Sequence, residues 1–348
     1  MKIITHWLAS FSLFLALPAS AQLVILQYHH IATDTPPVTS ISPAGFEEHM
    51  QLLEQENMVV VDLKDALAKI RAGVALPEKA VAITFDDAYV SIYDNAFPRL
   101  QARNWPFTVF VNTRAVDERH NVVMSWDQLR DMQNHGGLIA NHTQSHPYLI
   151  EPPQNTQLAD WLEMEINGAE QRLQKELGTS HKILAYPYGE YNVAVRDWLQ
   201  QQGYIALGQQ SGPVGASSHF QALPRYPAAG IYANPKTLRT KLYTKAFPIP
   251  AEQSVEPVLS TDNNPPALTL TFSSTDLYAR QIQCYSGAEG AIPTKVQQTG
   301  QGIQIDTAAR GPIKAGRDRY NCTAPSKNSP GWYYWYSQAW INPAVKNR

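Results

Sequence analysis

The stretch Val81-Ala82-Ile83-Thr84-Phe85-Asp86-Asp87 joins a short apolar run directly to two adjacent carboxylates. A continuous run of apolar and β-branched residues is typical of a buried strand in a parallel sheet. The C-terminal ends of such strands open onto the ligand crevice of α/β folds, so Asp86 and Asp87 are expected at the mouth of a site. Because consecutive residues of an extended segment point opposite ways, one carboxylate is free to face a metal while its neighbour faces a substrate or water. The competing interpretation is that the pair caps a helix starting near Tyr89.

A second polar cluster, Asn141-His142-Thr143-Gln144-Ser145-His146-Pro147, follows another short apolar run, Leu138-Ile139-Ala140. Two imidazoles and one carboxylate form a usable set of metal ligands, since nitrogen and oxygen donors suit zinc and its first-row neighbours. Three protein ligands leave one coordination position open for water. The two clusters together therefore favour a site for metal-assisted hydrolysis.

Composition and periodicity predict an α/β fold. The 348 residues are long enough for one large and one small domain, 44% of them are apolar, and the net charge of −2 gives no reason to expect nucleic acid or another polyanion as a partner. Short apolar runs alternate with amphipathic helical stretches from Leu23 to about Leu207, as in sheets or barrels built of βα units. The seven candidate strands are Val24–Gln27, Val59–Val61, Val81–Phe85, Phe107–Val111, Leu138–Ala140, Ile183–Tyr186 and Ile205–Leu207.

Several helices between these strands have recognisable start signals. A helix is predicted from Pro43 to Glu56 with Ser42 as its N-cap, and another begins at Ser125, where Ser125 and Gln128 are spaced as a capping box. Longer helices are predicted over Asn155–Leu177 and Asn192–Gln202. The resulting expectation is a barrel of about seven strands.

The N-terminal residues 1–21 read as a secretory signal peptide. Lys2 precedes an apolar stretch that is too short to span a bilayer, and Ala19-Ser20-Ala21 fits a cleavage site. No other segment is long enough for a membrane span, so a secreted or periplasmic protein is expected. In such an oxidising compartment the only two cysteines, Cys284 and Cys322, are predicted to form one disulfide.

Three motifs resemble those of the NodB-homology polysaccharide deacetylases, carbohydrate esterase family 4. Thr84-Phe85-Asp86-Asp87 is similar to their first motif, His142-Thr143-Gln144-Ser145-His146 to the His-Ser/Thr-x-x-His second motif, and Tyr186-Pro187-Tyr188-Gly189 to the Arg-x-Pro-Tyr-Gly third motif. The resemblance covers roughly Leu23 to Phe247 and implies a distorted (β/α) barrel with fewer than eight strands. The expected deacetylase domain is 22–247.

The resemblance assigns roles that adjacency alone leaves open. It implies one divalent ion on Asp87, His142 and His146, with zinc first and cobalt, nickel or iron as alternatives. Asp86 would be the general base, and the backbone N–H of Tyr188, next to Pro187, would stabilise the oxyanion.

A permuted histidine connects the chain to one subgroup of that family. Leu26-Gln27-Tyr28-His29 on the first strand resembles the Tyr-His element of enzymes that deacetylate poly-β-1,6-N-acetylglucosamine. The resemblance implies that His29 protonates the leaving amine, with His30 as the second candidate. His219, late in the domain, follows two serines and is interpreted as a loop residue.

The third motif departs from the family at Ala185, where an arginine that orients the catalytic base is expected. Arg225, in Leu223-Pro224-Arg225-Tyr226, is one candidate to reach the base from another strand. A packing or surface role for Arg225 is the alternative.

Beyond the barrel, 248–266 is rich in Pro, Asn and Ser and is interpreted as a linker, and 267–348 as a small β-rich module. Clean alternation, as in Leu268–Phe272, predicts a β-sandwich or a similar antiparallel arrangement. The aromatic strand Trp332–Tyr336 has rings on both faces. Core packing is one interpretation of these rings, and a carbohydrate-binding platform is the other.

The function implied by the resemblance is metal-dependent hydrolysis of N-acetyl groups on an N-acetylglucosamine polysaccharide. Poly-β-1,6-N-acetylglucosamine is the favoured substrate, with chitin oligomers or peptidoglycan as alternatives. A catalytically inactive glycan-binding protein is the hypothesis from another class, motivated by Ala185 and the aromatic strand. The oligomeric state stays open.

Overall fold

The structure is a computed structural model that describes residues 22–346, and the predicted signal peptide lies outside the described residues. Seven parallel strands form a half-barrel in the order β10-β1-β5-β6-β7-β8-β9, and β4 pairs with β5 beside this path. The two-stranded β2–β3 ladder follows β1. These strands span Val24–Tyr28 (β1), His30–Ile31 (β2), Ser40–Ile41 (β3), Val59–Val60 (β4), Ala80–Phe85 (β5), Phe107–Val111 (β6), Gly137–Asn141 (β7), Ile183–Ala185 (β8), Ile205–Leu207 (β9) and Tyr226–Pro227 (β10).

All seven predicted runs are strands, but the barrel uses them differently from the expectation. The run at Val59 pairs only with the start of β5, whereas the unpredicted β10 pairs with β1. β10 has two residues, one of them a proline, so it carries no readable periodicity. Leu223, just before it, forms a parallel bridge to Leu207, and this segment therefore lies between the two edges of the half-barrel.

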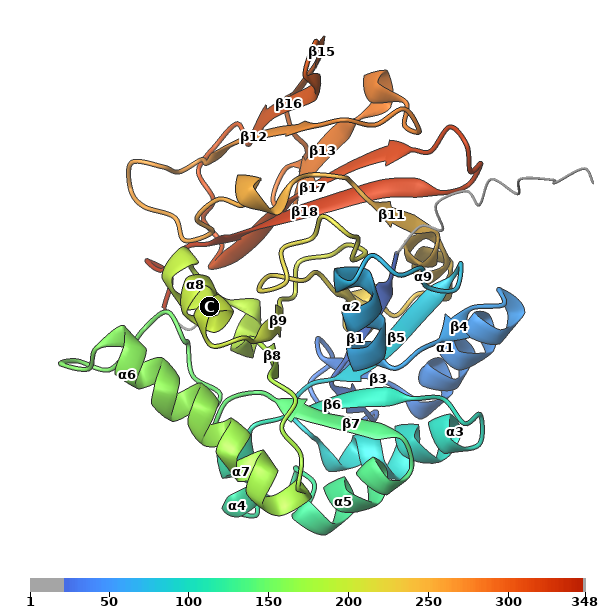
Figure 1. Cartoon of the computed structure of the whole chain (residues 1–348), viewed down its shortest axis with the longest axis vertical. Coiled ribbons are helices and arrows are strands. Elements are labelled where there is room, and N and C mark those ends of the chain that lie inside the picture. The colour runs from blue at the N-terminus through green and yellow to red at the C-terminus, as the bar shows by residue number, and fades with distance from the viewer. Residues whose placement is uncertain (1–21, 347–348) are drawn as a thin grey trace, which may run out of the picture.

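Helices cover the outside of the parallel sheet (Figure 1). Ser42 caps the first helix by accepting from Gly45 N, and the predicted capping box of Ser125 and Gln128 is present. The predicted Asn155–Leu177 helix is instead two α-helices joined by a π-helical turn at Glu163–Asn167. The helices span Pro43–Gln55 (α1), Leu63–Arg71 (α2), Phe97–Gln101 (α3), Thr113–Asp117 (α4), Trp126–Asn134 (α5), Leu158–Leu162 (α6), Gly168–Leu177 (α7), Val193–Gln201 (α8) and Pro235–Leu242 (α9).

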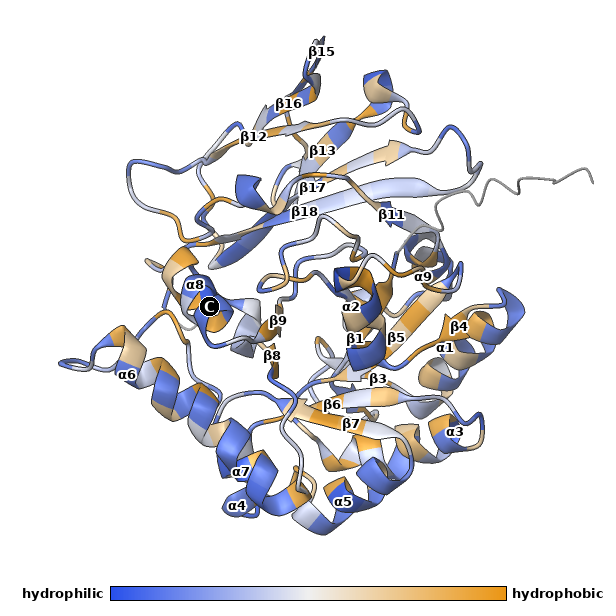
Figure 2. Ribbon diagram, viewed as in Figure 1, coloured by the Kyte–Doolittle hydropathy of each residue, from blue (hydrophilic) through white to orange (hydrophobic). Residues whose placement is uncertain are grey.

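Strand alternation divides the apolar side chains between two layers. On β5, Val81, Ile83 and Phe85 pack under the outer helices, while Ala82 belongs to the cluster inside the barrel. Figure 2 shows the parallel strands as largely hydrophobic and α5 and α7 as mostly hydrophilic. The same alternation directs Thr84 and Asp86 toward the barrel interior, because they are two and four residues from Ala82. Within the described residues, no helix is both long and apolar enough to cross a bilayer.

The C-terminal part forms a five-stranded sheet, β11-β18-β17-β13-β14, and a three-stranded sheet, β12-β16-β15. The strands span Thr244–Ala246 (β11), Ala267–Phe272 (β12), Gln283–Ser286 (β13), Gly290–Ala291 (β14), Thr294–Thr299 (β15), Gly302–Ala308 (β16), Arg317–Pro325 (β17) and Tyr333–Ile341 (β18). The segment expected as a linker is packed here, since Ile249 and Leu259 are buried in the core of these sheets and Val258 bridges to Ile341.

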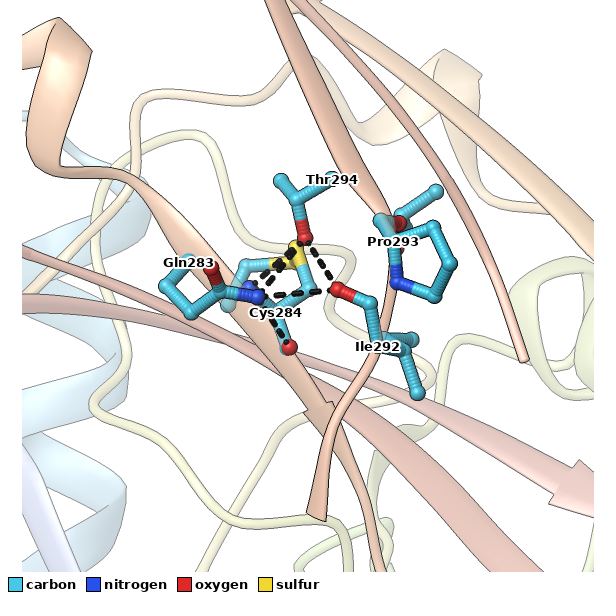
Figure 3. The surroundings of a disulfide bond; sticks show 7 residues. Gln283, Cys284, Ile292, Pro293 and Thr294 are labelled. Atoms are coloured by element: carbon cyan, nitrogen blue, oxygen red, sulfur yellow. Dashed lines mark hydrogen bonds between the residues drawn. A yellow bond between two sulfur atoms is a disulfide. The ribbon is translucent and has the colours of Figure 1, made fainter. Parts of the chain in front are cut away.

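The predicted disulfide between Cys284 and Cys322 is confirmed, and the two residues are directly opposite each other on β13 and β17. Figure 3 shows how Thr294 closes the neighbouring turn. Its hydroxyl accepts from Cys284 N and Gln283 Nε2, each at 3.1 Å, and donates to Ile292 O at 3.0 Å. The disulfide and this turn join β13 to β17 and to the start of β15.

The aromatic strand β18 packs on both faces, against the core of the C-terminal sheets on one side and against the barrel on the other. Tyr334 is buried in the core of the C-terminal sheets, whereas Trp335 packs on the barrel and meets the Tyr226 ring edge-on at 5.6 Å. Tyr333 is 41% exposed. Tyr334 and Trp335 point to opposite faces of β18, and both are packing residues.

Asp276 joins three segments of the C-terminal part. Its carboxylate accepts from Lys245 Nζ and Tyr334 OH, each at 2.9 Å, and from Asn328 N at 2.7 Å. Burial raises the pKa of Asp276, but the hydrogen bonds from Lys245 and the other donors outweigh burial and lower the pKa from 3.8 to about 2. The ionised carboxylate is therefore more stable in the folded chain than in the unfolded one.

We expect Asp276→Asn to destabilise the protein most above pH 4. A carboxyl group whose folded pKa is depressed contributes stability above its unfolded pKa, 3.8, and loses it as the pH falls through about 2. The difference in unfolding free energy between wild type and variant should shrink by roughly 2 kcal/mol over that range. Denaturant titrations between pH 6 and 2 measure it, with the exposed Asp262→Asn as the control for loss of one negative charge. A difference in unfolding free energy that stays constant with pH would contradict a lowered pKa of Asp276.

Candidate active site

The candidate site lies at the C-terminal ends of neighbouring parallel strands. His29 follows β1, Asp86 and Asp87 follow β5, and His142 follows β7. The strands β1 and β5 are paired in register at their ends, Tyr28 with Phe85, which puts His29 beside the two aspartates. The sheet thus brings together residues that are far apart in sequence.

Asp86 is fully buried and forms a bidentate ion pair with Arg225. Arg225 Nη1 lies 2.6 Å from Oδ1 and Nη2 lies 2.9 Å from Oδ2, and both side chains are 0% exposed. Gln27 Nε2 donates to Oδ2 at 2.7 Å, and Arg225 Nε donates to Gly208 O at 2.9 Å. Burial opposes the charge, but Arg225, then His142 and His29, outweigh it and lower the pKa of Asp86 from 3.8 to about 2. The alternative of a surface arginine is excluded by the complete burial of Arg225.

Asp87 turns away from Asp86 and faces the two histidines. Its Oδ1 lies 3.4 Å from His142 Nε2 and 3.3 Å from His146 Nε2, and the three donor atoms are all within 4.8 Å of one another. Donor atoms at roughly 2.0–2.2 Å from one tetrahedral ion are about 3.3–3.6 Å apart, so the two distances from Asp87 Oδ1 suit a shared metal.

The hydrogen bonds of the three residues also fit a cation. His142 Nδ1 donates to Ala185 O at 2.8 Å, which leaves Nε2 directed at Asp87. Asp87 Oδ1 is buried, and among the described residues nothing hydrogen-bonds to it. Burial, followed by the charge of His142, lowers the pKa of His146 to about 4, so its imidazole is neutral near pH 7 and available as a ligand. A buried carboxylate oxygen that faces two imidazole nitrogens is stabilised by a positive charge, which a bound cation or a protonated His142 can supply.

The loop that carries the histidines is fixed by buried polar contacts. Asn141 Oδ1 accepts from Thr143 N at 2.8 Å, and His146 N donates to Thr143 Oγ1 at 3.0 Å. Glu165, which is also buried, accepts from Ser145 N at 2.9 Å and from Ser145 Oγ at 2.8 Å. These contacts hold the spacing of the two imidazoles before any ion binds.

Five residues around the site that are not glycine have positive φ: Asp87 (69°), Ala88 (53°), Thr143 (70°), His146 (57°) and Tyr188 (60°). The left-handed region costs energy for a residue with a Cβ, and surrounding contacts must compensate for it. Such residues cluster at functional sites, and here they include two of the three candidate metal ligands.

His29 and His30 occupy different places. His29 lines the cleft, with Nε2 at 3.8 Å from Asp86 Oδ2. His30 is 7% exposed and stacks on the ring of Tyr89, with centroids 3.6 Å apart. Tyr89 itself lines the cleft, so His30 supports the cleft wall rather than facing it.

The third motif forms a short 3₁₀ turn, Pro187–Gly189, after β8. Pro187 is buried at its start, and the ring of Tyr188 stacks on Tyr148 with centroids 4.3 Å apart. The same ring meets His146 edge-on at 4.5 Å. The turn is therefore packed directly against one of the candidate ligands.

These residues open onto a cleft of about 1210 Å³. His29, Asp87, His146 and Tyr188 line its catalytic end, and residues of β17 and β18 line the opposite wall. Asp86 and Arg225 lie beneath this surface.

Comparison with known proteins identifies the barrel. Residues 73–207 match the family model described as polysaccharide deacetylase. Over these residues the barrel is similar to the polysaccharide deacetylase family. A poly-beta-1,6-N-acetyl-D-glucosamine N-deacetylase from Staphylococcus aureus is 32% identical over 166 residues, which cover 44% of this chain and 55% of that protein. A poly-beta-1,6-N-acetyl-D-glucosamine N-deacetylase from Escherichia coli is 24% identical over 242 residues, which cover 58% of this chain and 36% of that protein. The matches thus span less than two thirds of either relative.

A solved structure shares the fold of the barrel. The Streptococcus pyogenes deacetylase PplD, in complex with acetate, aligns with a TM-score of 0.58 and 22% identity. The alignment covers 64% of this chain and 99% of that chain. At this identity the likeness establishes the fold alone.

Three buried residues beside the candidate site were not singled out from the sequence: Gln27, Glu165 and Glu190, whose carboxylate accepts from Arg317 Nε at 2.8 Å. The sequence did hint at Gln27, because this polar side chain interrupts an otherwise apolar run, Val24-Ile25-Leu26, just before Tyr28. Glu165 and Glu190 carried none, since an acidic residue in a polar stretch is ordinarily solvated.

We expect Arg225→Ala to cost about 3–5 kcal/mol of unfolding free energy, because it leaves the carboxylate of Asp86 buried without its counterion. The double variant Asp86→Asn/Arg225→Met should cost clearly less than the sum of its two single variants, as both charges are then gone. Denaturant unfolding of wild type, Asp86→Asn, Arg225→Met and the double variant measures this coupling. Additive losses would show that the pair contributes no mutual stabilisation.

Proposed function

We propose that this chain is a metal-dependent polysaccharide N-deacetylase that hydrolyses N-acetyl groups of an N-acetylglucosamine polymer and releases acetate. The observation that carries the proposal is the convergence of Asp87, His142 and His146 within 4.8 Å, beside the buried, ionised Asp86. The match of residues 73–207 to the polysaccharide deacetylase model supports the same reaction class.

In this proposal Asp87, His142 and His146 would hold a divalent ion, which would lower the pKa of a water molecule and polarise the acetyl carbonyl. Zinc is the first candidate for this donor set, with cobalt, nickel and iron as alternatives. Asp86 accepts the proton of the attacking water, and its low pKa ensures that it is ionised at neutral pH. Arg225 and Gln27 fix the orientation of its carboxylate.

His29 and Tyr188 complete the chemistry. His29 lies 3.8 Å from Asp86 Oδ2 and faces the cleft, a position from which it donates a proton to the departing amine. The backbone N–H of Tyr188 stabilises the oxyanion, a contribution worth roughly 3–4 kcal/mol per donor in other enzymes.

The proposed substrate is a polymer rather than a single sugar. The cleft of about 1210 Å³ exceeds the roughly 300–1,000 Å³ of most small-ligand sites. Poly-β-1,6-N-acetylglucosamine is favoured for two reasons. Two relatives carry that substrate in their names. In addition, His29 follows the first strand, as in the subgroup that Leu26-Gln27-Tyr28-His29 resembles. Chitin oligomers and peptidoglycan are the alternatives. The disulfide is consistent with action outside the cytoplasm, in a secreted or periplasmic location.

The contrasting hypothesis, an inactive glycan-binding protein, was motivated by the missing arginine at Ala185. The guanidinium of Arg225 pairs with Asp86, so the absence of an arginine at Ala185 is no longer a reason to propose an inactive protein. Trp335 packs on the barrel, so that ring is not free to stack on sugar.

The test is acetate release from β-1,6- and β-1,4-linked N-acetylglucosamine oligomers by wild type stripped of metal and then reloaded. We expect no release from stripped protein, recovery on adding zinc or cobalt, and at least a 100-fold loss in His146→Ala because one of three ligands is gone. His135→Ala, an exposed histidine on the barrel surface, is the matched control and should retain full activity. Higher rates on the β-1,6 oligomers would support the favoured substrate, and higher rates on the β-1,4 oligomers would exclude it.

The binding hypothesis predicts a different result. Reloaded wild type would then release no more acetate than Asp86→Asn while still retaining the glycan. That outcome would overturn the deacetylase proposal.

A further inference from the structure

The C-terminal five-stranded sheet forms one wall of the catalytic cleft. Among the cleft residues, Ala315 precedes β17, Arg317 and Arg319 lie on it, and Ala339 lies on β18. On β17, Tyr320, Cys322 and Ala324 point into the core of the C-terminal sheets. Alternation therefore directs Arg317 and Arg319 to the opposite face, toward the barrel.

Arg317 reaches across the cleft to the turn that carries the third motif. Its Nε donates to Glu190 Oε1 at 2.8 Å, and its guanidinium carbon lies 5.1 Å from the centre of the Tyr188 ring. The side chain of Glu190 is 0% exposed, whereas that of Arg317 is 36% exposed. A buried carboxylate next to the turn is thus neutralised by a residue from a separate sheet, 127 positions along the chain.

The turn has a conformation that needs support from outside. Tyr188 has φ of 60°, and Gly189, with φ of 72°, lies so close to Gln209 that a Cβ there would be 2.7 Å from Gln209 Cβ. Strained backbone of this kind persists only where surrounding contacts hold it. The Tyr188 ring contacts Tyr148, His146 and Arg317 among other groups, so the arginine is one of the residues that fix the ring.

We propose that Arg317 is a positioning residue of the active site. It acts through Glu190 and the Tyr188 ring, and holds the Pro187–Gly189 turn so that the Tyr188 backbone N–H is fixed relative to the metal ligands. This inference rests on the proposed deacetylase function. Its consequence is that the C-terminal sheet completes the active site, and is more than an attached glycan-binding unit.

The test compares Arg317→Ala, Arg317→Lys and Glu190→Gln with wild type. We expect kcat for acetate release to fall roughly 10- to 100-fold in Arg317→Ala, since a small displacement of a catalytic group has effects of that size. KM should stay within about twofold, because the N–H acts on the transition state rather than on the bound substrate. Lysine retains the charge opposite Glu190 and should restore part of kcat.

Two controls separate positioning from loss of folding. Arg310→Ala removes another arginine of the same C-terminal part, 63% exposed and paired with Glu289, and should leave kcat unchanged. Thermal unfolding and bound-metal content should stay near wild-type values in Arg317→Lys. The double variant Arg317→Ala/Glu190→Gln should be no slower than Arg317→Ala alone, because the two residues act as one unit.

The outcomes are distinguishable. If wild type releases acetate and the folded, metal-loaded Arg317→Ala protein has an unchanged kcat, the inference is overturned while the proposed function stands. A raised KM at constant kcat overturns it as well, since Arg317 would then bind substrate directly. A wild type that releases no acetate overturns the proposed function and the inference together.

Discussion

Arg225 and Asp86 form an ion pair from which solvent is fully excluded. Removing either ion from water costs several kcal/mol, and only close geometry with further hydrogen bonds offsets that cost. Both conditions hold here, since two short contacts join the pair, Gln27 donates to the carboxylate, and Gly208 O accepts from the guanidinium. The pair fixes β10 against β5 and keeps one aspartate ionised inside the barrel. The roles proposed for Asp86 as general base and Asp87 as metal ligand depend on this ion pair.

The second carboxylate is directed differently by its backbone. Asp86 continues the inward alternation of β5, but Asp87 has positive φ and turns toward the histidine loop. There its Oδ1 meets His142 and His146, and the Nδ1 donation of His142 to Ala185 O sets which nitrogen faces it. Ala185, the position where the resemblance led us to expect an arginine, thus contributes its carbonyl, and Arg225 contributes a guanidinium from the segment just before β10.

The C-terminal sheet is shared between two packing surfaces. Even-numbered residues of β17 and β18, such as Tyr320 and Tyr334, fill the core of the C-terminal sheets, while Trp335 packs on the barrel. One face of this sheet therefore packs into the C-terminal core, and the other face lines the cleft with Arg317 and Arg319. This two-sided burial explains why β18 is aromatic on both faces.

Local pattern in the sequence determined much of the barrel. Apolar runs marked its longer strands, Ser42 and Ser125 marked helix starts, and the polar residues at strand ends marked Asp86, Asp87, His142 and His146 as candidates. These features depend on neighbours within a few positions, so periodicity and capping chemistry reveal them. Only the tertiary structure decided that Arg225 pairs with Asp86, that Gln27 joins them, and that Arg317 meets Glu190. Those contacts are set by strand order and by the packing of the C-terminal sheet on the barrel, and the spacing of residues along a chain carries no measure of their distance in space.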